Sequence, residues 1–327
     1  MLPERQFIAQ LRSTGRFRNR EIVVGIGDDC AVVRLPRGHQ ALITTDFSLE
    51  GVHFRRDWQS PECIGHRCLA RGLSDIAAMG GRPLAAFLSL ALPKDLAQKW
   101  VDRFFAGLLR LASRHRVELA GGDTAQSPGG VLADIVVLGS VERGKALQRS
   151  SARVGDQVYV TGKLGESAAA LELLSTGAIR KRDVFPEPRL NAGRWLQSKG
   201  IASAMIDVSD GLSTDLSHIC EESGVGASID ADAIPIHPSL WKLDKTESRS
   251  PASGVVLDLA LHAGEDYELL FTSPQSKRVP SRIEGVQVTR IGEITYRRKM
   301  HLIRNGKKEL LRPQGWEHFR ADSRDRD

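Results

Sequence analysis

Aspartates beside glycine, serine or threonine recur along this sequence of 327 residues, and they are the side chains best suited to chemistry. Five short motifs carry them: Gly25-Ile-Gly-Asp-Asp29, Thr44-Thr-Asp46, Leu73-Ser-Asp75, Gly121-Gly-Asp123-Thr124 and Asp207-Val-Ser-Asp-Gly211. Mg²⁺ prefers hard oxygen ligands and is usually held by a few carboxylates together with water and phosphate oxygens. Neighbouring glycines let the main chain approach phosphate closely and present N–H donors to it. The motifs together indicate a possible site for metal and phosphate.

Each motif taken alone is also ordinary turn chemistry, because Gly-Asp and Asp-Gly pairs are common in turns. The familiar nucleotide-binding signatures are absent. No Gly-Lys pair lies in a P-loop sequence, and the catalytic-loop and metal-binding motifs of protein kinases are missing. Any ATP bound by this chain must therefore be held in another way.

The composition is that of a soluble globular protein, with 41% hydrophobic and 26% charged residues, and the length favours two domains. The formal net charge of +6 would admit an anionic partner. The basic residues are scattered along the chain, so we expect no nucleic-acid partner. No apolar run approaches the roughly 18 residues of a membrane span, and no signal segment is visible, so we expect a cytoplasmic protein with no membrane partner.

Strand and helix patterns alternate and place these motifs at strand ends and turns. In the first half they predict strands at 22–24, 31–35, 41–45, 84–92, 117–120 and 131–141, and helices at 3–11, 60–79 and 95–115. In the second half they predict strands at 157–161, 204–208, 226–229, 267–272 and 286–294, helices at 165–175, 188–199 and 211–223, and a polar loop over 242–254. The alternation indicates an α/β class in both halves, with a boundary near residues 150–155.

The ordered motifs resemble those of the thiamine-monophosphate kinase family, which belongs to the fold superfamily of aminoimidazole ribonucleotide synthetase. The resemblance includes His53-Phe54, Val158-Tyr-Val-Thr-Gly162 and Gly264-Glu-Asp-Tyr-Glu-Leu269, and it extends from about residue 5 to Phe319. It implies a two-domain α/β (α+β) fold in which an N-terminal mixed sheet forms a shared barrel in a homodimer. Domain 1–150 would bind ATP and magnesium and would dimerise, and the α/β domain 151–327 would complete the substrate and phosphate site.

The same resemblance implies ATP-dependent phosphorylation of thiamine monophosphate to thiamine diphosphate, with several Mg²⁺ ions as cofactor and ATP as co-substrate. By position, the metal ligands would be Asp29, Thr44, Thr45, Asp46, Asp75, Asp123, Asp207 and Asp210. ATP would contact Gly122, Asp123, Arg149 and Ser209, and thiamine monophosphate would contact His53, Glu265 and Trp316. The residues with a direct part in catalysis would be Asp29, Asp46, Asp75, Asp123, Asp210 and Arg149.

The acceptor in such a reaction is itself a phosphate monoester, already largely ionised near neutral pH, so no general base is required. We therefore predict direct in-line transfer without a phosphoenzyme. The chain departs from the family pattern at Val52, at Arg71-Gly72 and at Ala263, which leaves the shape of the substrate pocket open. Two alternatives also remain open: another ATP-using member of the superfamily, or a protein that binds thiamine phosphate without catalysis.

Overall fold

The computed structural model describes residues 4–14, 19–26, 30–243 and 254–319. The chain divides into two compact units. The first comprises Met1–Leu147 with Ala170–Gly200, and the second comprises Gln148–Ala169 with Ile201–Asp327. Among the helices that the structure describes, none combines the length and the apolar composition that a membrane span requires.

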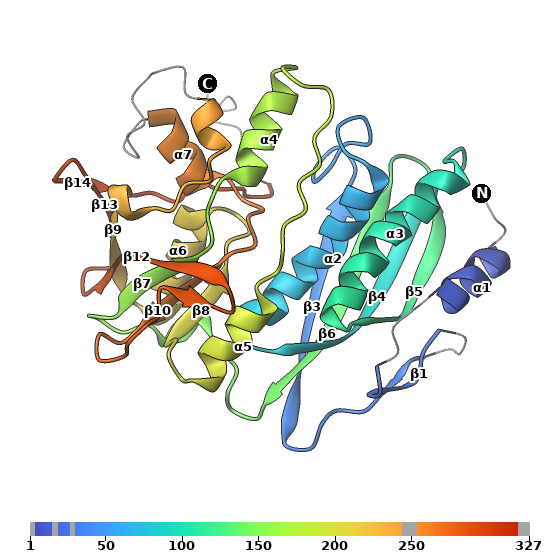
Figure 1. The fold of residues 1–327 in the computed structure, drawn as a ribbon, viewed down its shortest axis with the longest axis horizontal. Helices are drawn as coiled ribbons and strands as arrows, with labels where there is room; N and C mark the ends of the chain where they lie inside the picture. The colour runs from blue at the N-terminus through green and yellow to red at the C-terminus, as the bar shows by residue number, and fades with distance from the viewer. Residues whose placement is uncertain (1–3, 15–18, 27–29, 244–253, 320–327) are drawn as a thin grey trace. The chain divides into compact units, whose positions relative to one another are not determined.

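The first unit is built on a four-stranded sheet with the strand order β3-β6-β4-β5 (Figure 1). Its strands are β3 (His39–Leu49), β4 (Arg82–Pro93), β5 (Glu118–Ser127) and β6 (Leu132–Glu142). Strands β4 and β5 run parallel, whereas β6 is antiparallel to both of its neighbours. The mixed N-terminal sheet implied by the family resemblance is therefore confirmed. Its two edges are β3 and β5.

Two long helices, α2 (Pro61–Ala78) and α3 (Gln98–His115), lie side by side on one face of this sheet (Figure 1). Their apolar stripes form the core of the unit, where Leu69, Leu73 and Leu108 are fully buried. Helix α5 (Leu190–Ser198) packs against α2. Helix α1 (Glu4–Thr14) and a two-stranded ribbon of β1 (Ile22–Val24) and β2 (Val32–Val33) complete the unit.

Large apolar side chains lie exposed on the face of the sheet opposite to these helices. Successive residues of a strand point to opposite faces, so Leu42 points toward the helices and is 7% exposed. Ile43 and Phe47 point the other way and are 72% and 56% exposed. In this chain the sheet thus has one buried and one open face.

The second unit contains a larger sheet with the strand order β14-β13-β9-β12-β7-β10-β8, in which β11 also pairs with β12. The strands are β7 (Gln157–Thr161), β8 (Ala204–Asp207), β9 (Gly226–Asp230), β10 (Leu269–Ser273), β11 (Arg282–Ile283), β12 (Val286–Thr295), β13 (Met300–Arg304) and β14 (Lys307–Leu310). Only β13 and β9 pair in parallel among these described strands. Helices α6 (Leu212–Ser223) and α7 (Gly254–His262) belong to this unit, and α4 (Glu166–Ser175) crosses the division between the units.

Most of the predicted elements are confirmed within a few residues at each end. Helix α7 and the hairpin of β13 and β14 are present in the structure, although the sequence patterns did not predict them. The predicted polar loop over 242–254 begins in a short 3-10 turn, Leu240–Lys242. Residues 244–253 of that loop lie outside the described residues.

Candidate active site

One group of predicted metal ligands gathers where α2 crosses β3 in the first unit. Alternation along β3 points Thr44 and Asp46 toward the helices, and both are half-buried. The Thr44 hydroxyl Oγ1 donates a hydrogen bond to Oδ2 of Asp75, which lies on α2. The helix approaches the sheet closely, since a Cβ on Gly72 would lie 2.6 Å from Cγ2 of Val137. Thr44 and Asp75 thus form a pair of hard oxygen donors, and Asp46 lies on the same face of β3.

Thr45, the remaining predicted ligand on β3, points to the opposite face of the sheet. Its hydroxyl Oγ1 donates to Oδ1 of Asp134 on β6, at 2.7 Å. The Thr45 side chain is therefore separated from the Thr44–Asp75 pair by the thickness of the sheet.

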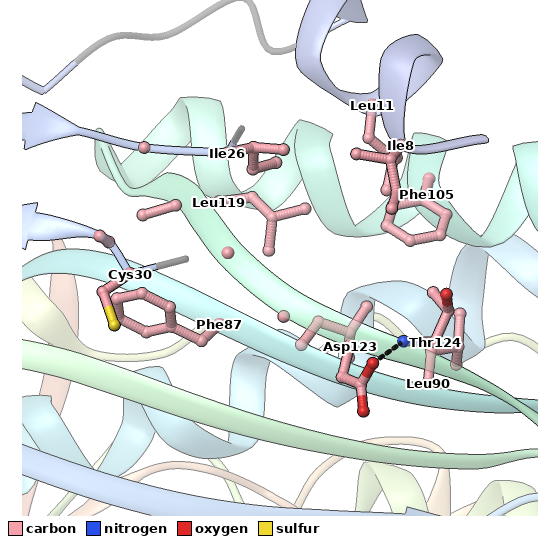
Figure 2. Close-up of a pocket in the computed structure, with 16 residues that line it drawn as sticks. Ile8, Leu11, Ile26, Cys30, Phe87, Leu90, Phe105, Leu119, Asp123 and Thr124 are labelled. Carbon is pink, nitrogen blue, oxygen red and sulfur yellow. Dashed lines mark hydrogen bonds between the residues drawn. The ribbon is translucent and has the colours of Figure 1, made fainter. Parts of the chain in front are cut away.

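The Gly121-Gly122-Asp123 motif lies within β5, at the other edge of the sheet. Gly122 has φ 149°, and a Cβ there would lie 1.9 Å from the carbonyl oxygen of Leu88, so only glycine fits. Asp123 is exposed, and its Oδ1 accepts the main-chain N–H of Thr124 at 2.8 Å (Figure 2). The motif therefore exposes a carboxylate on a main chain held close to its neighbouring strand.

A pocket of about 500 Å³ adjoins this motif in the first unit (Figure 2). Its lining is mainly apolar and comes from α1, the segment between β1 and β2, α3, β4 and β5. Figure 2 shows Ile8, Phe105 and Leu119 around the cavity, with Asp123 at its border. The size is within the range of small-molecule sites.

Asp46 and Asp123 lie at opposite edges of the sheet, in neighbouring rows. The register places Asp46, Ile135, Leu88 and Gly122 in one row across the four strands. Three strand spacings separate the two edges, which is about 14 Å of main-chain distance. Two oxygen atoms that bind the same Mg²⁺ lie no more than about 4 Å apart. Within this chain, the sheet therefore does not bring Asp46 and Asp123 together. Asp29, which was predicted to join them, lies outside the described residues.

The second unit carries its predicted ligands on the turn between β8 and α6. Asp207 ends β8 and is 2% exposed, and Ser209 and Asp210 follow before Gly211, which has φ 115°. Oδ2 of Asp215, in the first turn of α6, accepts the main-chain N–H groups of Ser209, Asp210 and Gly211 at 3.1, 3.2 and 3.1 Å. Burial raises the pKa of Asp215 well above its usual value, and the charges of Asp207 and Asp210 raise it further.

Two predicted substrate residues are hydrogen-bonded to the same turn through their main chains. The Glu265 N–H donates to the carbonyl oxygen of Ser209 at 2.8 Å, and the Trp316 N–H donates to that of Asp210 at 3.0 Å. The Trp316 side chain is 53% exposed, and its Nε1 donates to His318 Nε2 at 3.3 Å. The second unit thus brings Asp207, Ser209, Asp210, Glu265 and Trp316 together.

His53 and Arg149 lie apart from these clusters within their own units. His53 follows β3, and its Nδ1 accepts the Leu49 N–H at 3.0 Å, so the ring proton is on Nε2 when the ring is neutral. Arg149 is exposed, and its carbonyl oxygen accepts Ser223 Oγ at 2.7 Å at the C-terminal end of α6. That end lies about 17 Å along the helix from Gly211.

Asp215 and His218, which the sequence patterns did not single out, lie on α6 close to Asp210 of the Asp207–Gly211 turn. Each of the three places one ligand atom within 4.8 Å of the other two, and no other described group of three His, Cys, Asp or Glu side chains does so. Their signal in the sequence is the spacing 215 and 218, which puts both on one face of the helix predicted from residue 211. Carboxylates and hydroxyls at both clusters form a donor set that suits Mg²⁺.

Comparison with family models identifies both halves of the chain. The N-terminal domain of AIR synthase related protein matches residues 27–141, and the C-terminal domain of that family matches residues 153–305. Curated thiamine-monophosphate kinases of Salmonella typhimurium and Escherichia coli K12 are each 36% identical over 97% of this chain and 98% of their own length. That of Bacillus subtilis is 35% identical over 91% of this chain and 94% of its own.

Solved structures agree with these relatives. Thiamine-monophosphate kinase from Stenotrophomonas maltophilia K279a is 34% identical, with a TM-score of 0.79 over 93% of this chain and 96% of that one. A structure described as AaThiL complexed with AMPPCP and TMP is 32% identical, with a TM-score of 0.75 over 97% of both chains. The hydrogenase maturation protein HypE of E. coli shares the fold at 18% identity and a TM-score of 0.74. The chain therefore belongs to the thiamine-monophosphate kinase family.

Proposed function

We propose that this chain transfers the γ-phosphoryl group of ATP to the phosphate of thiamine monophosphate, giving thiamine diphosphate and ADP, with Mg²⁺ as cofactor. The observation that carries the proposal is the turn from Asp207 to Gly211. Its carboxylates suit a phosphate-bound metal, and the same turn is hydrogen-bonded to the segments that bear Glu265 and Trp316. The exposed indole of Trp316 and the carboxylate of Glu265 suit the cationic thiazolium ring and the pyrimidine ring of thiamine.

ATP fits the first unit through the pocket beside β5. An adenine ring requires an apolar cavity, and the pocket of about 500 Å³ offers Ile8, Phe105 and Leu119 for its faces. The phosphates would then extend along Gly121 and Gly122, where the main chain carries no side chain, toward Asp123. The complex of the related chain with AMPPCP and TMP supports the choice of both substrates.

The reaction needs positioning and charge neutralisation rather than a nucleophilic side chain. An oxygen of the acceptor phosphate forms a bond to the γ-phosphorus while the bond from that phosphorus to the β,γ-bridging oxygen breaks, and ADP leaves with the electron pair. Bound Mg²⁺ supplies neutralisation of the phosphate charges. The residues that would hold it are Asp29, Thr44, Thr45, Asp46, Asp75, Asp123, Asp207 and Asp210.

The remaining predicted residues act on the two substrates. The Ser209 hydroxyl would donate a hydrogen bond to an ATP phosphate. The exposed Arg149, which lies away from the Asp207–Gly211 turn, would neutralise phosphate charge. His53 accepts the Leu49 N–H at Nδ1, and its ring would contact thiamine monophosphate. Glu265 and Trp316 would hold the thiamine rings.

We further propose a homodimer in which the active site is shared. Exposed Ile43 and Phe47 on the open face of the sheet form an apolar surface that a second copy would cover. Closing two such sheets into one barrel would join edge β3 of one chain to edge β5 of the other. Asp46 would then lie near Asp123 of the partner subunit, which removes the separation of about 14 Å within one chain. Domain 1–150 would supply this interface and domain 151–327 the substrate turn.

An ADP-release assay coupled to NADH oxidation tests the proposed function on the full chain. With ATP and Mg²⁺, ADP formation should depend on thiamine monophosphate, and thiamine or a simple phosphate monoester should not replace it. Equal ADP formation with another acceptor would reject thiamine monophosphate as the substrate. Tight binding of thiamine monophosphate without ADP formation would instead indicate a binding protein.

A further inference from the structure

The Asp215 side chain is 1% exposed, and one of its oxygens accepts three main-chain N–H groups in succession. These are the N–H groups of Ser209, Asp210 and Gly211, all of which point at Oδ2. Asp215 follows this turn at the start of α6, so the chain folds back on itself to meet its own carboxylate. The turn is thus organised around a buried oxygen atom.

Successive N–H groups that converge on one point form an anion-binding nest, which in many nucleotide-binding loops holds a phosphate. In this chain the occupant of the nest is the Asp215 carboxylate. The three N–H donors are therefore already used, and a nucleotide phosphate has to approach this turn through the Ser209 hydroxyl or through metal held by Asp207 and Asp210.

The carbonyl groups of the same turn bind the two substrate-side segments. Val208, Ser209 and Asp210 accept hydrogen bonds from the N–H groups of Tyr267, Glu265 and Trp316, at 2.9, 2.8 and 3.0 Å. The turn therefore has its N–H groups bonded to Asp215 on one side and its carbonyl groups bonded to the 265–267 and 314–316 segments on the other. Any shift of the turn must move both segments.

We propose that Asp215 is a positioning residue that holds the phosphate-side and thiamine-side groups in register through this turn. It touches neither substrate. The inference rests on the proposed function for the roles of Glu265 and Trp316, but its structural content concerns the turn alone.

Amide hydrogen exchange on the wild-type chain gives the first test. The amides of residues 209–211 should be protected without any ligand, because Asp215 occupies the nest. Adding Mg²⁺ and a non-hydrolysable ATP analogue should protect them little further. Rapid exchange of these amides in the free protein, with protection only when the analogue is bound, would overturn the proposal, and this outcome does not depend on how any variant folds.

The substitution Asp215→Asn gives the second test, with Asp156→Asn as its matched control. Asp156 is also buried in the second unit, where its Oδ2 accepts hydrogen bonds from Arg153 N–H and Ser203 Oγ, at 3.0 and 2.6 Å, rather than from the Ser209–Gly211 amides. Asp215→Asn should speed exchange at 209–211, 265, 267 and 316 by about tenfold or more. Asp156→Asn should leave those amides unchanged at a similar loss of thermal stability.

Kinetics of the same two variants separate positioning from a structural role. Asp215→Asn should lower kcat and raise KM for thiamine monophosphate, each by about tenfold. Both change because the phosphate-side turn and the thiamine-side residues Glu265 and Trp316 would move together. Equal exchange patterns and equal kinetic losses in the two variants would overturn the proposal. If Asp215→Asn speeds amide exchange at the turn but the enzyme prefers another phosphate acceptor, the positioning role stands. Only the proposed substrate is then rejected.

Discussion

The main-chain N–H of Trp316 donates a hydrogen bond of 3.0 Å to the carbonyl oxygen of Asp210, a proposed metal ligand. The neighbouring N–H of Gly315 donates to Thr214 Oγ1 at 2.9 Å. The indole ring takes no part in these bonds and remains 53% exposed. The C-terminal segment is thus attached to the metal-bearing turn by its main chain, and the ring is left available for a ligand.

Substitution of Trp316 should weaken substrate binding without releasing this segment. Trp316→Ala should raise KM for thiamine monophosphate about tenfold, since a cation–π contact of about 1–2 kcal/mol is lost, and Trp316→Phe should raise it less. Steady-state kinetics and thermal melting check the result. Tyr296→Ala, which removes another exposed aromatic ring from the same unit, should leave KM unchanged. An unaltered KM in Trp316→Ala would remove Trp316 from the site.

Loss of the Asp75 charge should abolish activity while the fold persists. Asp75→Asn should reduce kcat by about 100-fold or more and raise the Mg²⁺ concentration needed for half activity. The reason is that the Thr44–Asp75 pair loses its negatively charged metal ligand. Magnesium titration of the initial rate, with circular dichroism as a check on folding, measures this. Asp95→Asn, at an exposed position in the same unit, is the control. A normal magnesium dependence in Asp75→Asn would contradict the assignment.

A methyl group at Gly122 should destabilise the first unit. Gly122→Ala places a Cβ 1.9 Å from the Leu88 carbonyl oxygen at a φ of 149°, which should lower the free energy of unfolding by about 2–4 kcal/mol. Urea denaturation measures the change. Gly129→Ala follows the same strand and meets nothing within 4 Å, so its stability should stay within about 0.5 kcal/mol of wild type. Equal stability of the two variants would show that β5 and β4 are not so closely packed.

Two inactive variants should complement one another if the site is shared between copies. Asp46→Asn and Asp123→Asn should each be inactive alone. When equal amounts are unfolded and refolded together, half of the dimers should be mixed and each should hold one intact site, giving roughly a quarter of wild-type activity. A mixture no more active than its components would place Asp46 and Asp123 in one site within a single chain.

Several elements of the fold could be predicted because they depend on local sequence. Helix α2 was predicted closely, since Ser60-Pro61 begins it and Gly80-Gly81 ends it. Helix α7 was missed because Gly254–His262 is a short, nearly continuous apolar run, which fits a buried strand as well as a helix. The β13–β14 hairpin did have a signal, Asn305-Gly306, whose two positive φ angles of 50° and 72° are typical of a two-residue hairpin turn.

Other relationships depend on tertiary structure and could not be predicted. The strand order β3-β6-β4-β5, which separates Asp46 from Asp123, follows from the parallel β4–α3–β5 crossover and from the insertion of β6 between β3 and β4. The convergence of three N–H groups on Asp215 depends on the positive φ of Gly211 and on where α6 begins. The aspartate motifs predicted which side chains carry the chemistry, whereas their grouping came from the fold.

Transfer of labelled phosphate distinguishes direct transfer to thiamine monophosphate from transfer through the protein. The full chain is mixed with [γ-³²P]ATP, Mg²⁺ and thiamine monophosphate, the reaction is quenched within the first turnover, and protein and small molecules are separated. We predict label in thiamine diphosphate in equal amount to the ADP formed, none bound to the protein, and no transfer in the Asp75→Asn variant. Label on the protein during turnover, or ADP formed without labelled thiamine diphosphate, would contradict direct transfer to thiamine monophosphate.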